Sequence, residues 1–369
     1  MFTSLRRFCV ARRNTMSERP SSRLLPGNRI GKYTITGLLG RGRKTEVYRA
    51  FHPDLKREVA IKLYSPQGEK TPELTACFRR EVQAIAALKH PNIVRIYDFD
   101  SGGDYYYLVM EFIEGTNLRD LLSLHRTGLN REDALRIFSQ LASAVAFAHD
   151  QGVVHGNITP DNVLLDTNQR PVLMDFRIPC LVENDQAAFD TPGEGSPTYL
   201  APEQITQGPL NIRSDIYALG IVFYEMITGD VPFKGDTRES VLSQHLNTPP
   251  TPPSVLSIGL DPRIEHVILK ALNKNPVDRY HSPRDMLVDL EREEAAGQYE
   301  TLNIDREMVG AVRKRQSEIM RFEMSRTDDA RLENLSSGKP SFFQLYFRFI
   351  ILGVILTIIF IIGLIILLA

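Results

Sequence analysis

Hydrophobic and polar residues alternate along several short stretches in the first third of the chain. The segments YTITGLLG (33–40) and TEVYRAFH (45–52) alternate with a period of two and are joined by a glycine-containing turn. REVAIKLY (57–64) and YYYLVMEFI (105–113) are similarly rich in β-branched and aromatic residues. Because successive side chains of a strand point to opposite faces, this pattern predicts strands of a half-buried sheet.

Helical periodicity interrupts the strands once and then dominates from about residue 117. In residues 73–89, Leu74, Phe78, Ile85 and Leu88 recur at helical spacing. Further segments with this period are 131–152, 219–229 and 262–272. The pattern predicts an α+β chain, in which a small β-rich lobe precedes a larger helical lobe.

The start of the helix predicted over 131–152 has a capping signal. Asn130 precedes it and Asp133 follows three residues later, as in a capping box. Gly152 then supplies the expected stop.

Composition and charge narrow the function classes. The chain has 369 residues, 43% apolar and 24% charged, with a formal net charge of −1. This balance is that of a globular protein and argues against nucleic-acid binding by bulk electrostatics. The cysteines Cys9, Cys77 and Cys180 show neither CxxC nor Cys/His metal-ligand spacing, which favours reduced thiols in a cytosol-like compartment.

The carboxyl-terminal segment 349–369 is uncharged and apolar throughout. At about 1.5 Å per residue it would extend about 31 Å, enough to cross a hydrocarbon core of about 30 Å. A buried core helix is the alternative, but it would need covering on every side. Since Lys339 and Arg348 precede the segment, we expect a single-pass membrane anchor with everything upstream in the cytoplasm.

The predicted domain organisation follows from these segments. Residues 1–32 are expected to form a disordered tail, in which Met16 is an alternative start to Met1. Residues 33–292 form the folded domain. Residues 293–341 form a charged juxtamembrane linker, and residues 342–369 form the anchor.

Two motifs in the β-rich lobe carry chemistry. Gly40 and Gly42, in the turn between two predicted strands, would let backbone amides approach phosphates closely. Lys62 lies in VAIK on the next strand, and Glu81 lies on the apolar face of the following helix. Because an unpaired charge is costly to bury, we expect Lys62 to be the partner of Glu81.

The order and spacing of these and later motifs resemble those of eukaryotic-type protein kinases, most closely the bacterial Ser/Thr kinases. The later motifs are HGNITPDN (155–162), DFR (175–177) and YLAPEQ (199–204). The resemblance covers about residues 33–292 and implies the two-lobed kinase fold, with an N-lobe over about 33–114 and a C-lobe over about 115–292. Asp215 and Arg279 fit the C-lobe's later landmarks, which hold that lobe together.

The resemblance also implies a site for ATP and Mg²⁺. Lys62 would hold the α- and β-phosphates and pair with Glu81, while Asn162 and Asp175 would ligate Mg²⁺. The other positions implied to bind the nucleotide are Gly40, Gly42, Val47 and Ala60.

The catalytic loop departs from the family pattern. Asn157 stands where the family has the aspartate that accepts the substrate proton, and an amide cannot take up that proton near neutral pH. Losing a general base costs about 10²–10⁴-fold in rate. Thr159 replaces the lysine that faces the γ-phosphate, and Gly156 replaces an arginine that in many kinases grips a phosphorylated loop. Asp161 occupies a variable position and is not expected to act as a substitute base.

Two further departures concern ATP itself. Arg177 replaces the glycine of the Asp-Phe-Gly motif, and Thr45 replaces the third glycine of the phosphate loop. One hypothesis is that Arg177 supplies the positive charge missing at Thr159. The activation segment 175–203 keeps the family's docking sequence, with Ser196 where threonine is usual, and has an acidic middle.

Two functional hypotheses follow from these observations. The first is a membrane-anchored pseudokinase that binds ATP and Mg²⁺ and serves as a signalling or scaffold module for a protein partner. The second is a weakly active Ser/Thr kinase that tolerates Asn157, because base catalysis is only part of the acceleration. A third, nucleotidyl transfer to a protein, has no positive support in the sequence.

Overall fold

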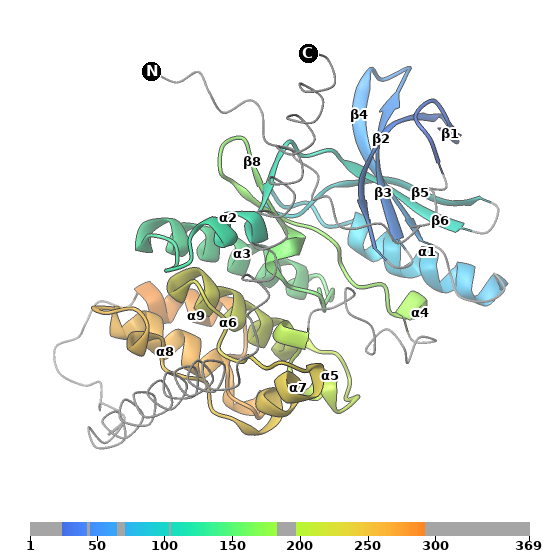
Figure 1. Ribbon diagram of the computed structural model, residues 1–369. Helices are drawn as coiled ribbons and strands as arrows, with labels where there is room; N and C mark the ends of the chain where they lie inside the picture. Colours follow the sequence, from blue (N-terminus) through green and yellow to red (C-terminus); the bar gives the residue numbers. More distant parts are fainter. Residues whose placement is uncertain (1–23, 43–44, 65–70, 103–104, 183–196, 292–369) are drawn as a thin grey trace, which may run out of the picture. The chain divides into compact units, whose positions relative to one another are not determined.

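A computed structural model describes residues 24–42, 45–64, 71–102, 105–182 and 197–291. The strands are β1 (Arg29–Ile30), β2 (Tyr33–Arg41), β3 (Thr45–His52), β4 (Arg57–Tyr64), β5 (Ile96–Gly102), β6 (Tyr105–Glu111), β7 (Gly115–Asn117), β8 (Val163–Asp166) and β9 (Pro171–Leu173). The α-helices are α1 (Pro72–Ala86), α2 (Leu118–Leu124), α3 (Arg131–Asp150), α4 (Pro179–Val182), α5 (Pro202–Ile205), α6 (Ile212–Thr228), α7 (Arg238–Asn247), α8 (Pro262–Ala271) and α9 (Pro283–Glu291). A β-rich lobe is followed by a helical lobe, as the sequence predicts (Figure 1).

The N-lobe sheet is antiparallel, with the strand order β1-β2-β3-β4-β6-β5. Alternation along β6 divides its residues between two apolar layers. Tyr106 and Leu108 pack in the cluster that contains α1, whereas Tyr107 and Val109 pack in the cluster on the other face. Strands β4 and β6 are therefore buried on both faces, whereas β2 and β3 keep the alternation of a half-buried sheet.

The first strand corrects one predicted boundary. Residues 1–32 were expected to be a disordered tail, but β1 pairs with β2, and Ile30 is only 2% exposed in the N-lobe core. Residues 24–32 therefore belong to the folded domain. Residues 1–23 lie outside the described part of the chain.

Helix α1 begins where the sequence predicts and ends slightly earlier. The side chain of Thr71 caps it by accepting a hydrogen bond from the Leu74 amide. Phe78, Val82 and Ile85 form its buried face, which joins an apolar cluster shared with β6 and α3. Helix α1 thereby packs against elements of both lobes.

The C-lobe core is built around α3 and α6. Asn130 caps α3 by accepting from the Asp133 amide at 2.9 Å, which is the predicted capping interaction. Phe138 of α3 stacks on Phe223 of α6 with ring centroids 3.9 Å apart. The C-lobe also has a small sheet in the order β7-β8-β9, which the sequence pattern did not indicate. Strand β8 begins directly after the loop that follows α3.

The membrane-anchor prediction falls on residues outside the described part of the chain. Within the described residues, no helix combines the length and the apolar character that a membrane crossing requires. The linker predicted over 293–341 also lies outside them.

Candidate functional site

Lys62 and Asp175 form an ion pair between strand β4 of the N-lobe and the DFR segment of the C-lobe. The side chain of Lys62 is 10% exposed and that of Asp175 is 23% exposed. Asp175 adopts a left-handed backbone conformation with φ +67°, which is uncommon for a non-glycine residue and frequent at functional sites. The structure thus brings together two residues that the sequence assigned to one site.

The environment of Lys62 favours its charged form. Burial alone would lower the pKa of the amine, but the Asp175 carboxylate beside it outweighs this effect and raises the pKa above its ordinary value. Lys62 is therefore a permanent cation at physiological pH, as a residue that holds phosphates must be.

The expected pair between Lys62 and Glu81 is not formed, so this prediction is corrected. Among the described residues, the ion-pair partner of Glu81 within 4.0 Å is Arg80, at 3.6 Å. The Glu81 side chain is 32% exposed and therefore does not need a buried cation. Lys62 instead pairs with the carboxylate of Asp175.

The predicted phosphate loop lies between β2 and β3. Gly40 pairs with Val47 across these strands, just after a shift in register. A Cβ atom at Gly40 would meet nothing within 4 Å, so protein packing does not require glycine there. The Gly42 amide donates to the Thr45 carbonyl at 2.8 Å and narrows the turn. The open space beside Gly40 is compatible with the close approach of a ligand.

Val47 and Ala60, both assigned to the nucleotide site, lie together in one apolar cluster. Ala60 belongs to its buried part, with Met110 of β6 and Val172 of β9, and Val47 packs against it. Strands of both lobes therefore supply an apolar surface that could contact the flat face of a base.

The loop that carries Asn157 is held by the buried carboxylate of Asp215 on α6. Asp215 accepts hydrogen bonds from the backbone amides of His155, at 2.8 Å, and Gly156, at 2.7 Å, and it contacts His149 at 2.8 Å. The ring of His155 is buried, and its Nε2 lies 3.1 Å from the Met174 carbonyl. Burial lowers the pKa of His155, so this histidine is a neutral structural link.

Asn157 lies at the end of this scaffold and next to both metal-site candidates. Its side-chain nitrogen Nδ2 donates to the backbone carbonyl of Asp175 at 3.5 Å. Its backbone carbonyl accepts from Asn162 Nδ2 at 2.8 Å. With the nitrogen of Asn162 engaged, its side-chain oxygen is the atom suited to a hard cation such as Mg²⁺.

Neither remaining polar residue of the loop replaces the missing carboxylate. Thr159 is 7% exposed, and its carbonyl accepts from the Asn162 amide at 3.0 Å. Asp161 pairs with Arg119 at 3.3 Å. The carboxylate that could have substituted for an aspartate at 157 is therefore engaged elsewhere.

Residues 33–287 match the protein kinase domain family. The chain belongs to the protein kinase family. It is 38% identical to the serine/threonine-protein kinase PrkC of Bacillus subtilis over 268 residues, which cover 72% of this chain and 41% of that protein. It is 36% identical to PknB of Mycobacterium leprae over 273 residues, or 72% of this chain and 44% of that one. The matched region thus spans less than half the length of these curated relatives.

The solved structures agree with this assignment. The kinase domain of Mycobacterium tuberculosis PknI superimposes with a TM-score of 0.58 at 26% identity. The match covers 72% of this chain and 98% of that domain. The expected resemblance to bacterial Ser/Thr kinases is confirmed.

Two departures from the kinase pattern lie against each other. Gly156 has φ +71°, and a Cβ atom there would lie 2.6 Å from Leu210 Cδ2 and 3.3 Å from Arg177 Cβ. The Arg177 amide also donates to the His155 carbonyl at 2.9 Å. The stem of Arg177 thus covers the position where many kinases have an arginine and this chain has Gly156. The sequence alone did not link these two substitutions.

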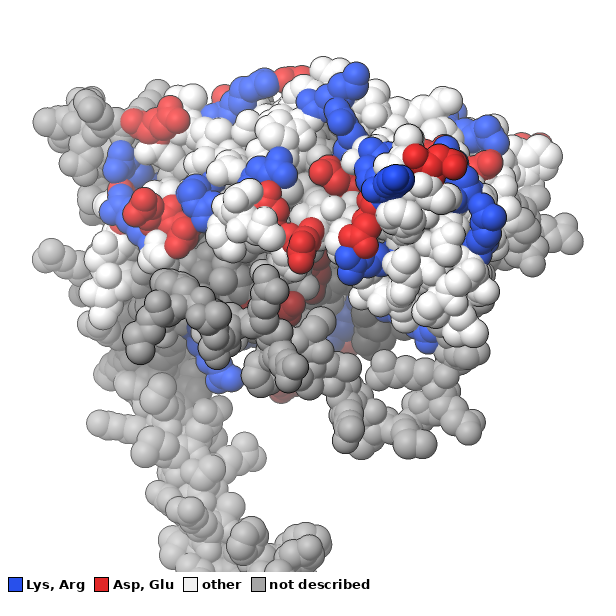
Figure 2. All heavy atoms as spheres, turned by 90° about the horizontal axis from the view of Figure 1, so that it is seen from above, with Lys and Arg blue, Asp and Glu red and all other residues white. Residues whose placement is uncertain are grey.

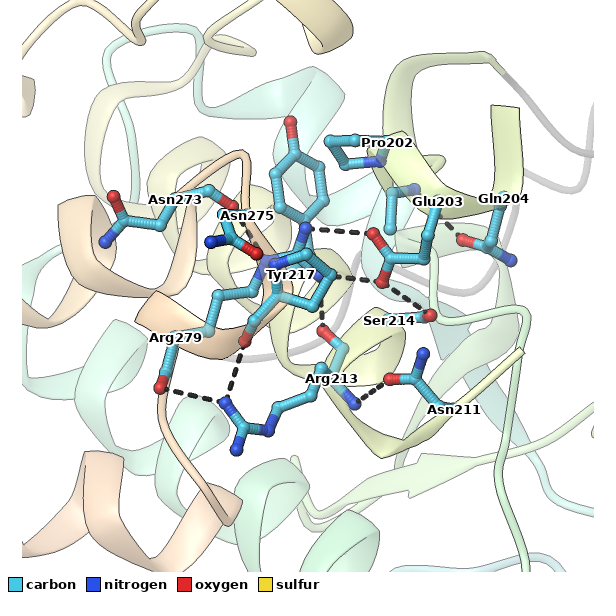
Figure 3. A network of polar contacts seen from close by, with 12 residues as sticks. Pro202, Glu203, Gln204, Asn211, Arg213, Ser214, Tyr217, Asn273, Asn275 and Arg279 are labelled. Carbon is cyan, nitrogen blue, oxygen red and sulfur yellow. Dashed lines mark hydrogen bonds and ion pairs between the residues drawn. The ribbon is translucent and has the colours of Figure 1, made fainter. Parts of the chain in front are cut away.

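The end of the activation segment is fixed by Glu203 and Arg279 (Figure 3). Arg279 makes a bidentate ion pair with Glu203, with N–O distances of 2.8 and 2.9 Å. Arg279 also donates to the carbonyls of Asn273, Arg213 and Lys274. Arg279 is therefore a buried residue that holds segments of the C-lobe together, as expected.

A second polar network, which is partly buried, was not predicted from the sequence. Arg119 of α2 contacts both Tyr199 of the activation segment and Glu225 of α6, and Tyr199 donates to Glu225. Burial and the Glu225 carboxylate raise the pKa of Tyr199. The available signal was Glu225 itself, a charge within the apolar stretch LGIVFYEMITG.

The donor set fits a nucleotide-bound Mg²⁺ better than a metal held by protein alone. Within the described residues, no group of three or more His, Cys, Asp and Glu side chains could hold a metal ion. Asn162 and Asp175 would supply two oxygen ligands, and phosphates and water would supply the others.

On the face shown in Figure 2, basic and acidic side chains are interspersed and form no patch of one sign.

Proposed function

We propose that this protein kinase family member is a membrane-anchored pseudokinase, which binds Mg²⁺-ATP and transfers phosphate poorly or not at all. The observation that carries the proposal is the contact of Lys62 with Asp175, while an amide occupies position 157. Lys62, Asn162 and Asp175 supply the charge and the ligands for a magnesium nucleotide.

The part of the site that would transfer phosphate lacks the groups that this reaction requires. Asn157 can orient a hydroxyl group through its amide but cannot accept the proton. Thr159 carries no charge to stabilise the transferred phosphate, and Asp161 is engaged by Arg119. ATP would then act as a ligand that organises the two lobes for a protein partner.

The anchor completes the proposal. The uncharged segment 349–369 would confine the kinase domain to the cytoplasmic face of a membrane. Confinement raises the effective concentration of a partner on the same membrane, which suits a binding module.

The test is the thermal stability of the full chain with and without Mg²⁺-ATP. A ligand at about 100 times its Kd adds about 2.7 kcal/mol, or about 5–10 °C in Tm for a domain of this size. Lys62→Ala and Asp175→Ala should abolish the shift, whereas Lys32→Ala, at an exposed lysine of the same lobe, should keep it. A chain that Mg²⁺-ATP does not stabilise would refute nucleotide binding.

The weak-kinase reading is tested by restoring the carboxylate. Under that reading the wild-type chain transfers γ-phosphate to a protein, and Asn157→Asp increases the rate. Under the proposal, wild-type transfer stays close to that of Lys62→Ala, which sets the background of the assay.

A further inference from the structure

Two cysteines that are far apart in the sequence lie together in the structure. Cys77 is on helix α1, and Cys180 is on α4 at the start of the activation segment. Cα atoms of the two helices approach within 8 Å, and Cys180 packs against the apolar cluster that contains Phe78, the residue after Cys77. The Cys77 side chain is close enough to act on the Cys180 thiol. Both are free and partly exposed, so a small oxidant in solution can reach them.

The surroundings give the two sulfurs different properties. Cys180 packs against the apolar cluster that contains Phe78 and Val82, and burial raises the pKa of its thiol to about 12. Cys77 lies at the helix surface, where the Arg80 guanidinium donates to its sulfur at 3.6 Å. Because Cys180 packs against the apolar cluster and Cys77 does not, an oxidant from solution meets Cys77 first.

We propose that Cys77 and Cys180 form a redox modification site, at which a peroxide converts the thiol pair into a reversible disulfide. Cys77 sulfur attacks the peroxide and breaks its O–O bond, which gives a sulfenic acid and releases an alcohol or water. Cys180 sulfur then attacks the Cys77 sulfur and displaces the hydroxyl group, which leaves as water with the Cys180 proton. The peroxide is reduced by two electrons, and the two thiols are oxidised to one S–S bond.

The position of the pair suggests what the bond would do. Glu81 lies one helical turn after Cys77, and its charge acts on the Cys180 thiol, so α4 lies near the part of α1 that carries Glu81. A disulfide would hold α4 against α1 with Glu81 apart from Lys62. This consequence rests on the proposed nucleotide binding, whereas the disulfide itself does not.

The experiment is peptide mapping of the full chain without reduction, after treatment with hydrogen peroxide and alkylation of the remaining thiols. We expect a linked peptide pair that contains Cys77 and Cys180 and disappears on treatment with a dithiol. Cys9→Ser is the matched control and should keep the link. Cys77→Ser and Cys180→Ser should each lose it and retain the wild-type Tm, which shows that they fold.

Separate peptides with sulfinic or sulfonic acids at Cys77 and Cys180, or a link from either to Cys9, would overturn the site. The second measurement is the Kd for Mg²⁺-ATP. We expect it to rise about fivefold or more on oxidation, at the lower end of ordinary coupling between sites. The Kd of Cys77→Ser should not respond to peroxide. An unchanged Kd in the linked wild type would refute the coupling, and absence of ATP binding in the reduced chain would count against the proposed function alone.

Discussion

Replacing Glu203 by glutamine tests how strongly the activation segment is anchored. The side chain of Arg279 is 0% exposed and that of Glu203 is 11% exposed, so the substitution leaves a buried guanidinium without its anion. Removing one partner of a buried pair costs about 3–5 kcal/mol. Arg279 would keep its hydrogen bonds to three carbonyls, so we expect about 3 kcal/mol. At about 2–4 °C per kcal/mol, Tm should fall by about 6–12 °C.

A matched control is available in the N-lobe. Arg49 and Glu58 also form a bidentate pair, at 2.9 and 2.6 Å, but their side chains are 44% and 42% exposed. Glu58→Gln should therefore cost at most about 1 kcal/mol. Equal shifts in Tm for Glu203→Gln and Glu58→Gln in a thermal scan would refute the argument from burial.

The pH dependence supplies a second check on this pair. Burial acts to raise the pKa of Glu203, but its hydrogen bonds to Arg279 outweigh this effect, and the pKa lies below its ordinary value. The contribution is thus present above the unfolded-state pKa of about 4.3 and is lost as the pH falls through the folded-state pKa. The difference in Tm between the wild type and Glu203→Gln should narrow below about pH 4.

Three further predictions concern the loop, the C-lobe and the nucleotide. Gly156→Ala should lower stability by about 1–3 kcal/mol in a thermal scan, because φ is +71° and the new Cβ would meet Leu210; unchanged stability would contradict this. Burial lowers the pKa of His245 to about 3, so the Tm of the wild type should fall as the pH drops below about 6.5. The Tm of His245→Gln should fall less between about pH 7 and pH 5, and parallel profiles of Tm against pH would contradict this prediction. Arg177→Gly should weaken Mg²⁺-ATP binding in a calorimetric titration if Arg177 supplies charge to the phosphates, and an unchanged affinity would exclude that role.

Local patterns were sufficient for most of the fold. Alternation located β2 and β3, and β-branched and aromatic residues located β4 and β6. Apolar spacing located α1, α3, the second part of α6, and α8. The sequence was sufficient to identify Asn130 as the cap of α3, because capping depends on residues only three positions apart. The sheet formed by β7, β8 and β9 was missed, since strands of three or four residues are too short to show a period.

The site was predictable in its members but not in their pairing. Kinase motifs indicated Lys62, Glu81 and Asp175, yet which carboxylate meets Lys62 depends on how α1 lies relative to β4. A sequence does not contain that distance. The contact between Gly156 and Arg177 was hidden for the same reason, because it joins two segments only in three dimensions.

The most direct test of the central claim is to measure bound nucleotide and transferred γ-phosphate in the same sample of the full chain with Mg²⁺-ATP and a protein acceptor. We predict about one bound nucleotide per chain, and phosphate transfer close to the background set by Lys62→Ala. Transfer that clearly exceeds this background, or a wild-type chain that binds no more nucleotide than Lys62→Ala, would contradict the account.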